Sequence, residues 1–251
     1  MSGCCLTDDR TSFRSLSRLP PAQHVMFRIK ICGVTNVEDA LAAVAAGADA
    51  IGLNFYPRSP RFVELSQARH IIDALEGRAV AVGVFVNATV EAICETAERL
   101  GLDQVQLSGD EPPEMLDELT MIVGDCVLRT FRVAPGGYDA QRVYLETCRE
   151  LGCVPHRILW DAFDSSAYGG TGRRADWDLA ARLVVSGELP PLVLAGGLRA
   201  ENVEAAILAV RPVAVDTASG VESSPGRKDP EQFKRFVAAA RAAFDKLTSA
   251  D

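Results

Sequence analysis

Residues 28–36 read Arg-Ile-Lys-Ile-Cys-Gly-Val-Thr-Asn, and this stretch decides how the chain folds. It predicts a strand that ends abruptly at Gly33, followed by a helix that begins at Asn36, a good N-cap residue. Strand alternation places Lys30 and Cys32 on one face and two isoleucines on the other. A strand covered by helices is normally apolar on both faces. A cation and a thiol near its carboxyl end therefore indicate a functional face, because α/β proteins carry their chemistry at that edge.

The same order of a short apolar run and a helical segment recurs from Phe27 to the end of the chain. Eight such βα units in about 225 residues predict a single-domain α/β protein, a closed (β/α)₈ TIM barrel over residues 26–251. An open doubly wound sheet also alternates strands and helices, but no GxGxxG motif follows the first strand. The expected strands cover 28–32, 48–55, 79–86, 103–107, 126–133, 157–161, 191–195 and 213–216. The expected helices cover 37–46, 65–76, 89–100, 111–119, 140–151, 176–184, 200–210 and 230–247.

Residues 1–25 differ in character from the rest of the chain. Arginine recurs at every fourth position, at 10, 14 and 18, which is a pattern that a targeting peptide could have. The acidic pair Asp8-Asp9, however, is unusual in a targeting peptide. Translation from Met26 is a further alternative. We interpret residues 1–25 as a disordered or spurious N-terminal extension.

Composition excludes several classes of protein. The 251 residues carry a formal charge of −8 and no basic stripe, so no nucleic-acid partner is expected. No apolar run approaches the roughly 20 residues that a membrane span requires. Seven scattered cysteines show no metal-binding spacing, which fits a reducing, cytoplasmic compartment and argues against a metal site. We expect a monomer or a homodimer that acts on a small molecule.

Polar and small residues collect in the loops that follow the predicted strands. Residues 55–63 carry two arginines, whose planar side chains suit a carboxylate or phosphate. Asp161 ends the sixth strand, where a carboxylate facing the barrel mouth is costly unless it is paired or used. Glycine-rich loops at 195–198 and 216–222 follow the seventh and eighth strands, where barrels often bind phosphate. A phosphorylated ligand is therefore predicted.

Several motifs together resemble one enzyme family. Lys-Ile-Cys-Gly at 30–33, Ser-Pro-Arg at 59–61, Tyr-Gly-Gly-Thr-Gly at 168–172, Ala-Gly-Gly-Leu at 195–198 and the segment 216–229 occur in the order typical of phosphoribosylanthranilate isomerases of tryptophan biosynthesis. The resemblance implies an isomerase that performs an Amadori rearrangement on a phosphorylated substrate and needs neither a metal nor an organic cofactor.

The resemblance also implies roles for individual residues. Cys32 would be the general base, Asp161 the general acid, and Arg61 would hold the anthranilate carboxylate. Ser108 is a departure, because the family usually has histidine there. The residues expected to bind the substrate are Arg61, Gly170, Gly196, Gly197, Asp216, Ser219 and Gly220.

The two catalytic roles demand opposite electrostatics. Asp161 needs a raised pKa to hold a proton, whereas Cys32 needs a lowered one, because a free thiol is mostly protonated at pH 7. Lys30 is the nearest cation and is expected to pair with Asp216 or Asp161. A tight pair would leave the thiol near its ordinary pKa and a loose pair would lower it; the sequence slightly favours the loose pair.

Three alternatives compete with this assignment. The related histidine-pathway isomerase uses two aspartates, and indole-glycerol-phosphate synthase uses lysine and glutamate, so a cysteine paired with an aspartate argues against both. A barrel that binds the ligand without turning it over would be expected to lack Cys32 or Asp161, and both are present.

Overall fold

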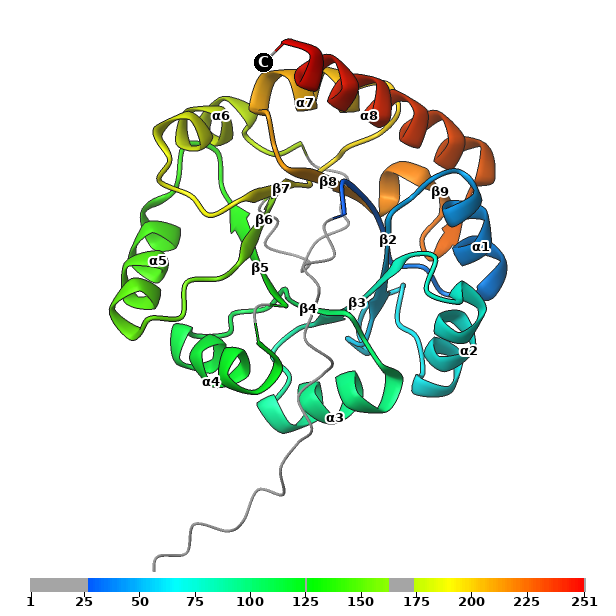
Figure 1. The fold of residues 1–251 in the computed structure, drawn as a ribbon, viewed down its shortest axis with the longest axis horizontal. Coiled ribbons are helices and arrows are strands. Elements are labelled where there is room, and N and C mark those ends of the chain that lie inside the picture. Colours follow the sequence, from blue (N-terminus) through cyan, green and yellow to red (C-terminus); the bar gives the residue numbers. More distant parts are fainter. Residues whose placement is uncertain (1–26, 125, 163–173, 251) are drawn as a thin grey trace, which may run out of the picture.

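The computed structural model describes residues 27–124, 126–162 and 174–250. Within these residues eight strands pair in parallel, in chain order, and β8 closes on β1. Helices surround the strands on the outside, as the view down the barrel shows (Figure 1). The predicted TIM barrel is confirmed. The predicted extension at residues 1–25 lies outside the described residues.

The strands and helices alternate through the barrel, with a short insertion after β8. The barrel strands are β1 (Ile29–Cys32), β2 (Ala50–Asn54), β3 (Val80–Phe85), β4 (Gln104–Leu107), β5 (Val127–Val133), β6 (Arg157–Ala162), β7 (Leu192–Leu194) and β8 (Ala214–Thr217). The helices are α1 (Val37–Ala45), α2 (Leu65–Leu75), α3 (Val90–Leu100), α4 (Pro113–Val123), α5 (Asp139–Leu151), α6 (Trp177–Ser186), α7 (Val203–Val210) and α8 (Pro230–Ala250). The insertion holds the 3₁₀ helix η1 (Ser219–Val221) and the strands β9 (Glu222–Ser224) and β10 (Arg227–Lys228).

The buried apolar residues form two cores, one between the strands and the helices and one inside the barrel. Outward residues of the strands, such as Ile29, Ile31 and Trp160, pack under the helices in the larger core. Inward residues, such as Val82, Leu159 and Val193, form a smaller core inside the barrel. Burial of both faces follows from the parallel architecture. The polar inward residues near the carboxyl ends of the strands are the exceptions, and they mark the mouth.

Most element boundaries lie within two residues of the predictions, and the larger differences are the end of α4, the start of α7 and the end of α8. Helix α4 begins at Pro113 rather than at residue 111, because Pro112 takes the N-cap position and the fixed φ of proline suits the first helical turn. The Glu111 side chain instead accepts hydrogen bonds from the backbone of Asn87 and Gly109. The paired strands β9 and β10 were not predicted either, because each is at most three residues long.

None of the helices in the described part of the chain is both long enough and apolar enough to cross a bilayer.

Candidate active site

The site lies at the carboxyl ends of the barrel strands, where Cys32 ends β1 and Asp161 is the penultimate residue of β6. Alternation along each strand turns these side chains inward, because their neighbours Ile31 and Trp160 pack in the outer core. The sequence-based expectation that the thiol and the carboxyl share the barrel mouth agrees with this placement.

A buried ion pair lies directly below the thiol. Lys30 Nζ donates to Asp216 Oδ1 at 2.9 Å across the neighbouring strands β1 and β8, and the lysine side chain is fully buried. Burial alone would lower the pKa of Lys30, but the charges of Asp216 and Cys32 raise it above its ordinary value. The lysine therefore stays protonated. Of the two predicted partners, Asp216 and Asp161, the lysine pairs with Asp216, and the pair is tight rather than loose.

The environment of Cys32 favours the thiol over the thiolate. Burial raises the pKa of Cys32, and the carboxylate of Asp216 raises it further, against the opposing charges of Lys30 and Lys228. The slight expectation of a loose pair that lowers this pKa was wrong. The thiol is removed from water, which disfavours its charged form, and Asp216 offsets the positive charge of Lys30 that would otherwise lower the pKa of Cys32.

Asp161 has the raised pKa that an acid requires. Burial raises the pKa of its carboxyl to about 6, and the nearby charge of Asp216 adds to this. The Ala162 N–H donates to Asp161 Oδ1 at 2.8 Å and, like the charges of Arg132 and Lys30, acts in the opposite direction. About half of the carboxyl groups therefore carry a proton near pH 6.

Gly52 on β2 leaves the space that the thiol and the lysine occupy. A Cβ atom at this position would lie 2.9 Å from Cys32 Sγ and 3.1 Å from Lys30 Nζ, inside a packed barrel. Any side chain here must displace one of the two groups.

We expect Gly52→Ala to lower the free energy of unfolding by about 1–3 kcal/mol, the usual cost of overpacking a core. The measurement is the melting temperature by circular dichroism. Gly137→Ala is the matched control, because a Cβ there would meet its nearest atom at an ordinary 3.6 Å. Equal melting temperatures for the two variants would show that the space beside Cys32 is not tightly packed.

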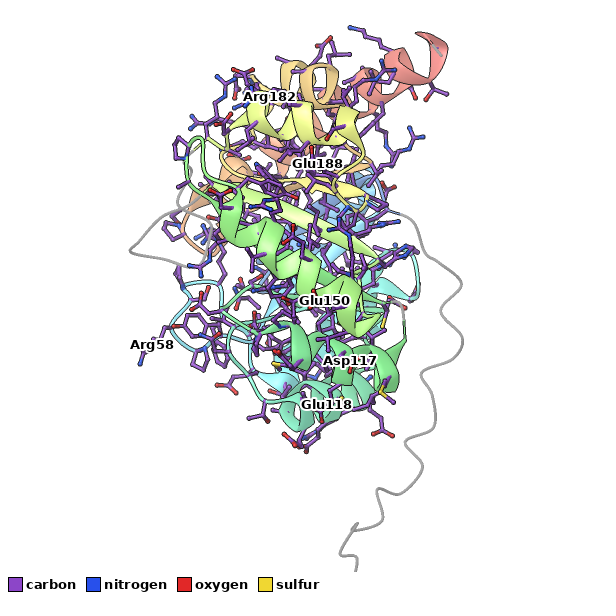
Figure 2. The ribbon with its side chains drawn as sticks, turned by 90° about the vertical axis from the view of Figure 1, so that its left-hand side faces the viewer. Arg58, Asp117, Glu118, Glu150, Arg182 and Glu188 are labelled. Atoms are coloured by element: carbon purple, nitrogen blue, oxygen red, sulfur yellow. The ribbon has the colours of Figure 1, made fainter. Side chains whose placement is uncertain are left out.

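The two arginines of the β2–α2 loop differ in position. Arg58 points away from the barrel into solvent (Figure 2). Arg61 is buried, and its Nε and one terminal nitrogen donate to the two carboxylate oxygens of Glu222 at 2.8 and 2.7 Å. The Glu222 carboxylate thus holds the Arg61 guanidinium in one orientation at the mouth.

Lys228 completes this buried cluster. Its Nζ donates to Glu222 Oε1 at 2.9 Å, to the Cys32 carbonyl at 2.6 Å and to the Ala218 carbonyl at 2.9 Å. Burial opposes the ionisation of Glu222, yet the hydrogen bonds from Arg61 and the charge of Lys228 hold its pKa below the usual range. The cluster ties the backbone of the first strand to the arginine loop and to the loop after β8.

The loops after β7 and β8 lie against each other. Gly196 and Gly197 lie just after β7, separated from it by Ala195, and Ser219 begins η1. A Cβ at Gly220 would lie 1.8 Å from the Leu198 carbonyl oxygen, so only glycine permits this close approach. The two predicted phosphate-binding loops therefore form one continuous surface. Gly170 lies outside the described residues.

Ser108 is buried in the barrel beside two other polar side chains. Its hydroxyl accepts from Gln106 Nε2 at 3.0 Å and lies 3.0 Å from the Thr130 hydroxyl. A small hydroxyl fits here between β4 and β5. Among the described residues, no cluster of three His, Cys, Asp or Glu side chains suits a metal ion.

Comparison with known proteins identifies the family. The family model of N-(5'-phosphoribosyl)anthranilate (PRA) isomerase matches residues 29–239. This chain belongs to the N-(5'-phosphoribosyl)anthranilate isomerase family.

Individual family members show how far the similarity extends. The Geobacter sulfurreducens isomerase is 45% identical over 216 residues, which cover 86% of this chain and 99% of that protein. The Myxococcus xanthus isomerase is 45% identical over 215 residues, with coverage of 86% and 96%. The crystal structure of the Thermotoga maritima isomerase has a TM-score of 0.75 and 38% identity, and covers 86% of this chain and all of the other. A further isomerase structure, in complex with reduced 1-(o-carboxyphenylamino)-1-deoxyribulose 5-phosphate, has a TM-score of 0.72 and 38% identity, with the same coverage.

The family assignment confirms the predicted enzyme class. Members of the phosphoribosylanthranilate isomerase family convert an aldose into a ketose, so the chain is an isomerase enzyme. The buried contacts of Glu222 with Arg61 and Lys228 were not predicted from the sequence. Both residues lie within the recognised segment 216–229, but no local signal connected either of them with Arg61.

Proposed function

We propose that this chain catalyses the Amadori rearrangement of N-(5'-phosphoribosyl)anthranilate to 1-(2-carboxyphenylamino)-1-deoxyribulose 5-phosphate in tryptophan biosynthesis. Cys32 acts as the general base and Asp161 as the general acid. The observation that carries this proposal is the placement of an inward thiol and an inward carboxyl of raised pKa at the same end of one barrel.

The reaction needs one proton donor and one proton acceptor. Asp161 gives its proton to the furanose ring oxygen, the bond from that oxygen to C1′ breaks, and a Schiff base forms. The Cys32 thiolate then takes the proton from C2′, and the resulting enolamine tautomerises to the ketone. The two transfers balance, because the product is an isomer of the substrate. A positioned acid or base typically contributes 10²–10⁴-fold to the rate.

The active protonation state is a minority form of the free enzyme. It requires a protonated Asp161, whose pKa is about 6, together with an ionised Cys32, whose pKa lies above the usual range. Between these two pKa values the loss of protonated acid and the gain of thiolate cancel as the pH rises. The value of kcat/KM should therefore rise up to about pH 6 and then stay level, and its lower inflection reports Asp161.

Arg61 holds the anthranilate carboxylate, and the loops after β7 and β8 hold the phosphate. Support for the first role comes from the buried Glu222 carboxylate, which orients the arginine before a substrate arrives. Support for the second comes from the contact between the two glycine-containing loops, at the position where barrels often bind phosphate. Gly170, Gly196, Gly197, Asp216, Ser219 and Gly220 complete the proposed substrate site.

Arg61→Lys should raise KM about tenfold and lower kcat much less. A lysine offers a point charge in place of a planar guanidinium, which binds Glu222 along one edge and can present its other edge to the substrate carboxylate. Steady-state kinetics measure both constants, and Arg58→Lys is the matched control because Arg58 faces solvent. A KM within about twofold of wild type would mean that another residue binds the carboxylate.

Turnover itself tests the proposed function. The purified chain is incubated with freshly prepared phosphoribosylanthranilate, and the change in anthranilate fluorescence is followed against a sample without enzyme. Formation of the deoxyribulose phosphate, verified by mass spectrometry of the borohydride-reduced product, is the expected result. Absence of this product with a folded protein would contradict the proposal.

The assembly is proposed to be a monomer or a homodimer. One related structure is described as that of monomers generated from the dimeric Thermotoga maritima isomerase. Sedimentation velocity of the purified chain distinguishes the two states.

A further inference from the structure

Two charged side chains at the mouth, Arg132 and Asp110, take no part in the proposed proton transfers or in the proposed substrate contacts. Arg132 is the penultimate residue of β5, and Asp110 lies in the loop after β4. One terminal nitrogen of Arg132 forms an ion pair with Asp110 Oδ1. The arginine side chain is 17% exposed and the aspartate side chain 62% exposed, so the pair lies at the rim of the barrel.

Arg132 lies beside the proposed acid. In the register of β5 and β6, Arg132 pairs with Asp161, and both residues follow the inward alternation of their strands. Neighbouring strands are about 4.8 Å apart, so the two side chains leave the sheet side by side. A guanidinium so placed could reach the Asp161 carboxylate directly. Its charge already opposes the effect of burial on the pKa of Asp161.

Asp110 is held firmly in its position. Its backbone N–H donates to Asn87 Oδ1 at 2.7 Å, and the Asn87 N–H donates to Glu111 Oε1 at 2.8 Å. Glu111 in turn forms a buried ion pair with Arg129 at 2.9 Å. The loop that carries Asp110 is thus fixed from below by a charged pair that does not face the mouth.

We propose that Asp110 is a positioning residue for the isomerisation: it holds the Arg132 guanidinium at the rim and so prevents Arg132 from forming an ion pair with Asp161. The inference rests on the proposed role of Asp161 as the general acid. An ion pair with Arg132 would stabilise the carboxylate and remove the proton that ring opening requires.

The other charged groups around Asp161 in the described residues come from β1 and β8. From β1 come Lys30 and Cys32, and the lysine is committed to Asp216 of β8. Strand β7, the other neighbour of β6, carries only leucine and valine. Asp164 and Arg173 in the segment 163–173 lie outside the described residues. Of the two described cations that act on Asp161, Lys30 and Arg132, it is Arg132 that forms an ion pair with Asp110.

The test uses two variants with opposite expected effects. Asp110→Asn releases Arg132, so the lower inflection of kcat/KM should move from about pH 6 downward by about one unit or more, since a nearby opposite charge lowers a carboxyl pKa by about 1–3 units. Arg132→Met removes the cation, so the same inflection should move upward. Glu201→Gln, which breaks an exposed ion pair with Arg235 on the helical surface, is the matched control and should leave the profile unchanged.

A second measurement separates this inference from the proposed function. The Asp161 carboxyl is titrated by ¹³C NMR in wild type and in both variants, with its signal assigned by its loss in Asp161→Asn. Opposite movements of this titration in the two variants support the inference. A titration that stays the same in both folded variants, or moves in the same direction, overturns it. If the carboxyl moves as expected while the kcat/KM profile does not, the positioning stands and the assignment of Asp161 as the acid fails.

Discussion

Cys32→Ser is expected to lower kcat by at least about 10³-fold, because a serine hydroxyl is far too weak a base at neutral pH to take a proton from carbon. The substitution keeps nearly the same shape inside the packed barrel, where Gly52 leaves room for one such side chain. Substrate binding should therefore survive. The measurement is single-turnover conversion of phosphoribosylanthranilate, which separates the chemical step from product release.

The control for Cys32→Ser is the same substitution at a cysteine that lies away from the barrel mouth. Cys94 is buried in helix α3, so Cys94→Ser should retain wild-type turnover. Binding of the reduced product, 1-(o-carboxyphenylamino)-1-deoxyribulose 5-phosphate, should have the same Kd in Cys32→Ser as in wild type. A kcat within about threefold of wild type in Cys32→Ser would remove the thiol from the mechanism.

The local pattern of the sequence was sufficient to predict the barrel and the inward residues of its first and sixth strands. Alternation in 28–32 placed Lys30 and Cys32 together, and the structure confirms that both turn inward. It also confirms that Lys30 pairs with an inward carboxylate, which is Asp216 rather than the alternative Asp161, since an ammonium inside a barrel requires a carboxylate. These predictions worked because they follow from a period of two residues and from the cost of burying a charge.

The strength of that ion pair could not be predicted from the sequence. The separation of Lys30 and Asp216, and the burial of Cys32, depend on the closure of β8 against β1. Since both are tertiary quantities, the sequence could not tell whether the lysine would lower the pKa of the thiol. In the structure, the burial of Cys32 and the nearby carboxylate of Asp216 raise the pKa of the thiol.

The cluster of Arg61, Glu222 and Lys228 was beyond sequence reasoning for a similar reason. Arg61 and Glu222 are 161 positions apart, and the two-residue strand β10 that presents Lys228 is too short to show a period. The resemblance gave Arg61 a role, but not the carboxylate that orients it. The proposed substrate contact of Arg61 therefore depends on a neighbour that only the folded chain reveals.

Asp161→Asn is expected to lower kcat by about 10²–10⁴-fold, because an amide cannot deliver a proton to the ring oxygen. The amide keeps the size of the carboxyl and can still accept the 2.8 Å hydrogen bond from the Ala162 N–H, so the end of β6 should keep its conformation.

The pH dependence identifies the proton that Asp161→Asn removes. In wild type the lower inflection of kcat/KM is expected near pH 6, where the buried carboxyl titrates. With asparagine this inflection should vanish, and the residual kcat/KM should rise with pH until Cys32 is ionised, since only the thiolate then limits the rate. The folded-state pKa lies above the ordinary value of 3.8, so the carboxylate destabilises the fold as the pH rises from about 4 to about 6. The melting temperature of Asp161→Asn should accordingly fall less than that of wild type across this interval. An inflection near pH 6 that persists in the variant would show that it does not report Asp161, and retained turnover would point to another acid, with Asp216 the next candidate.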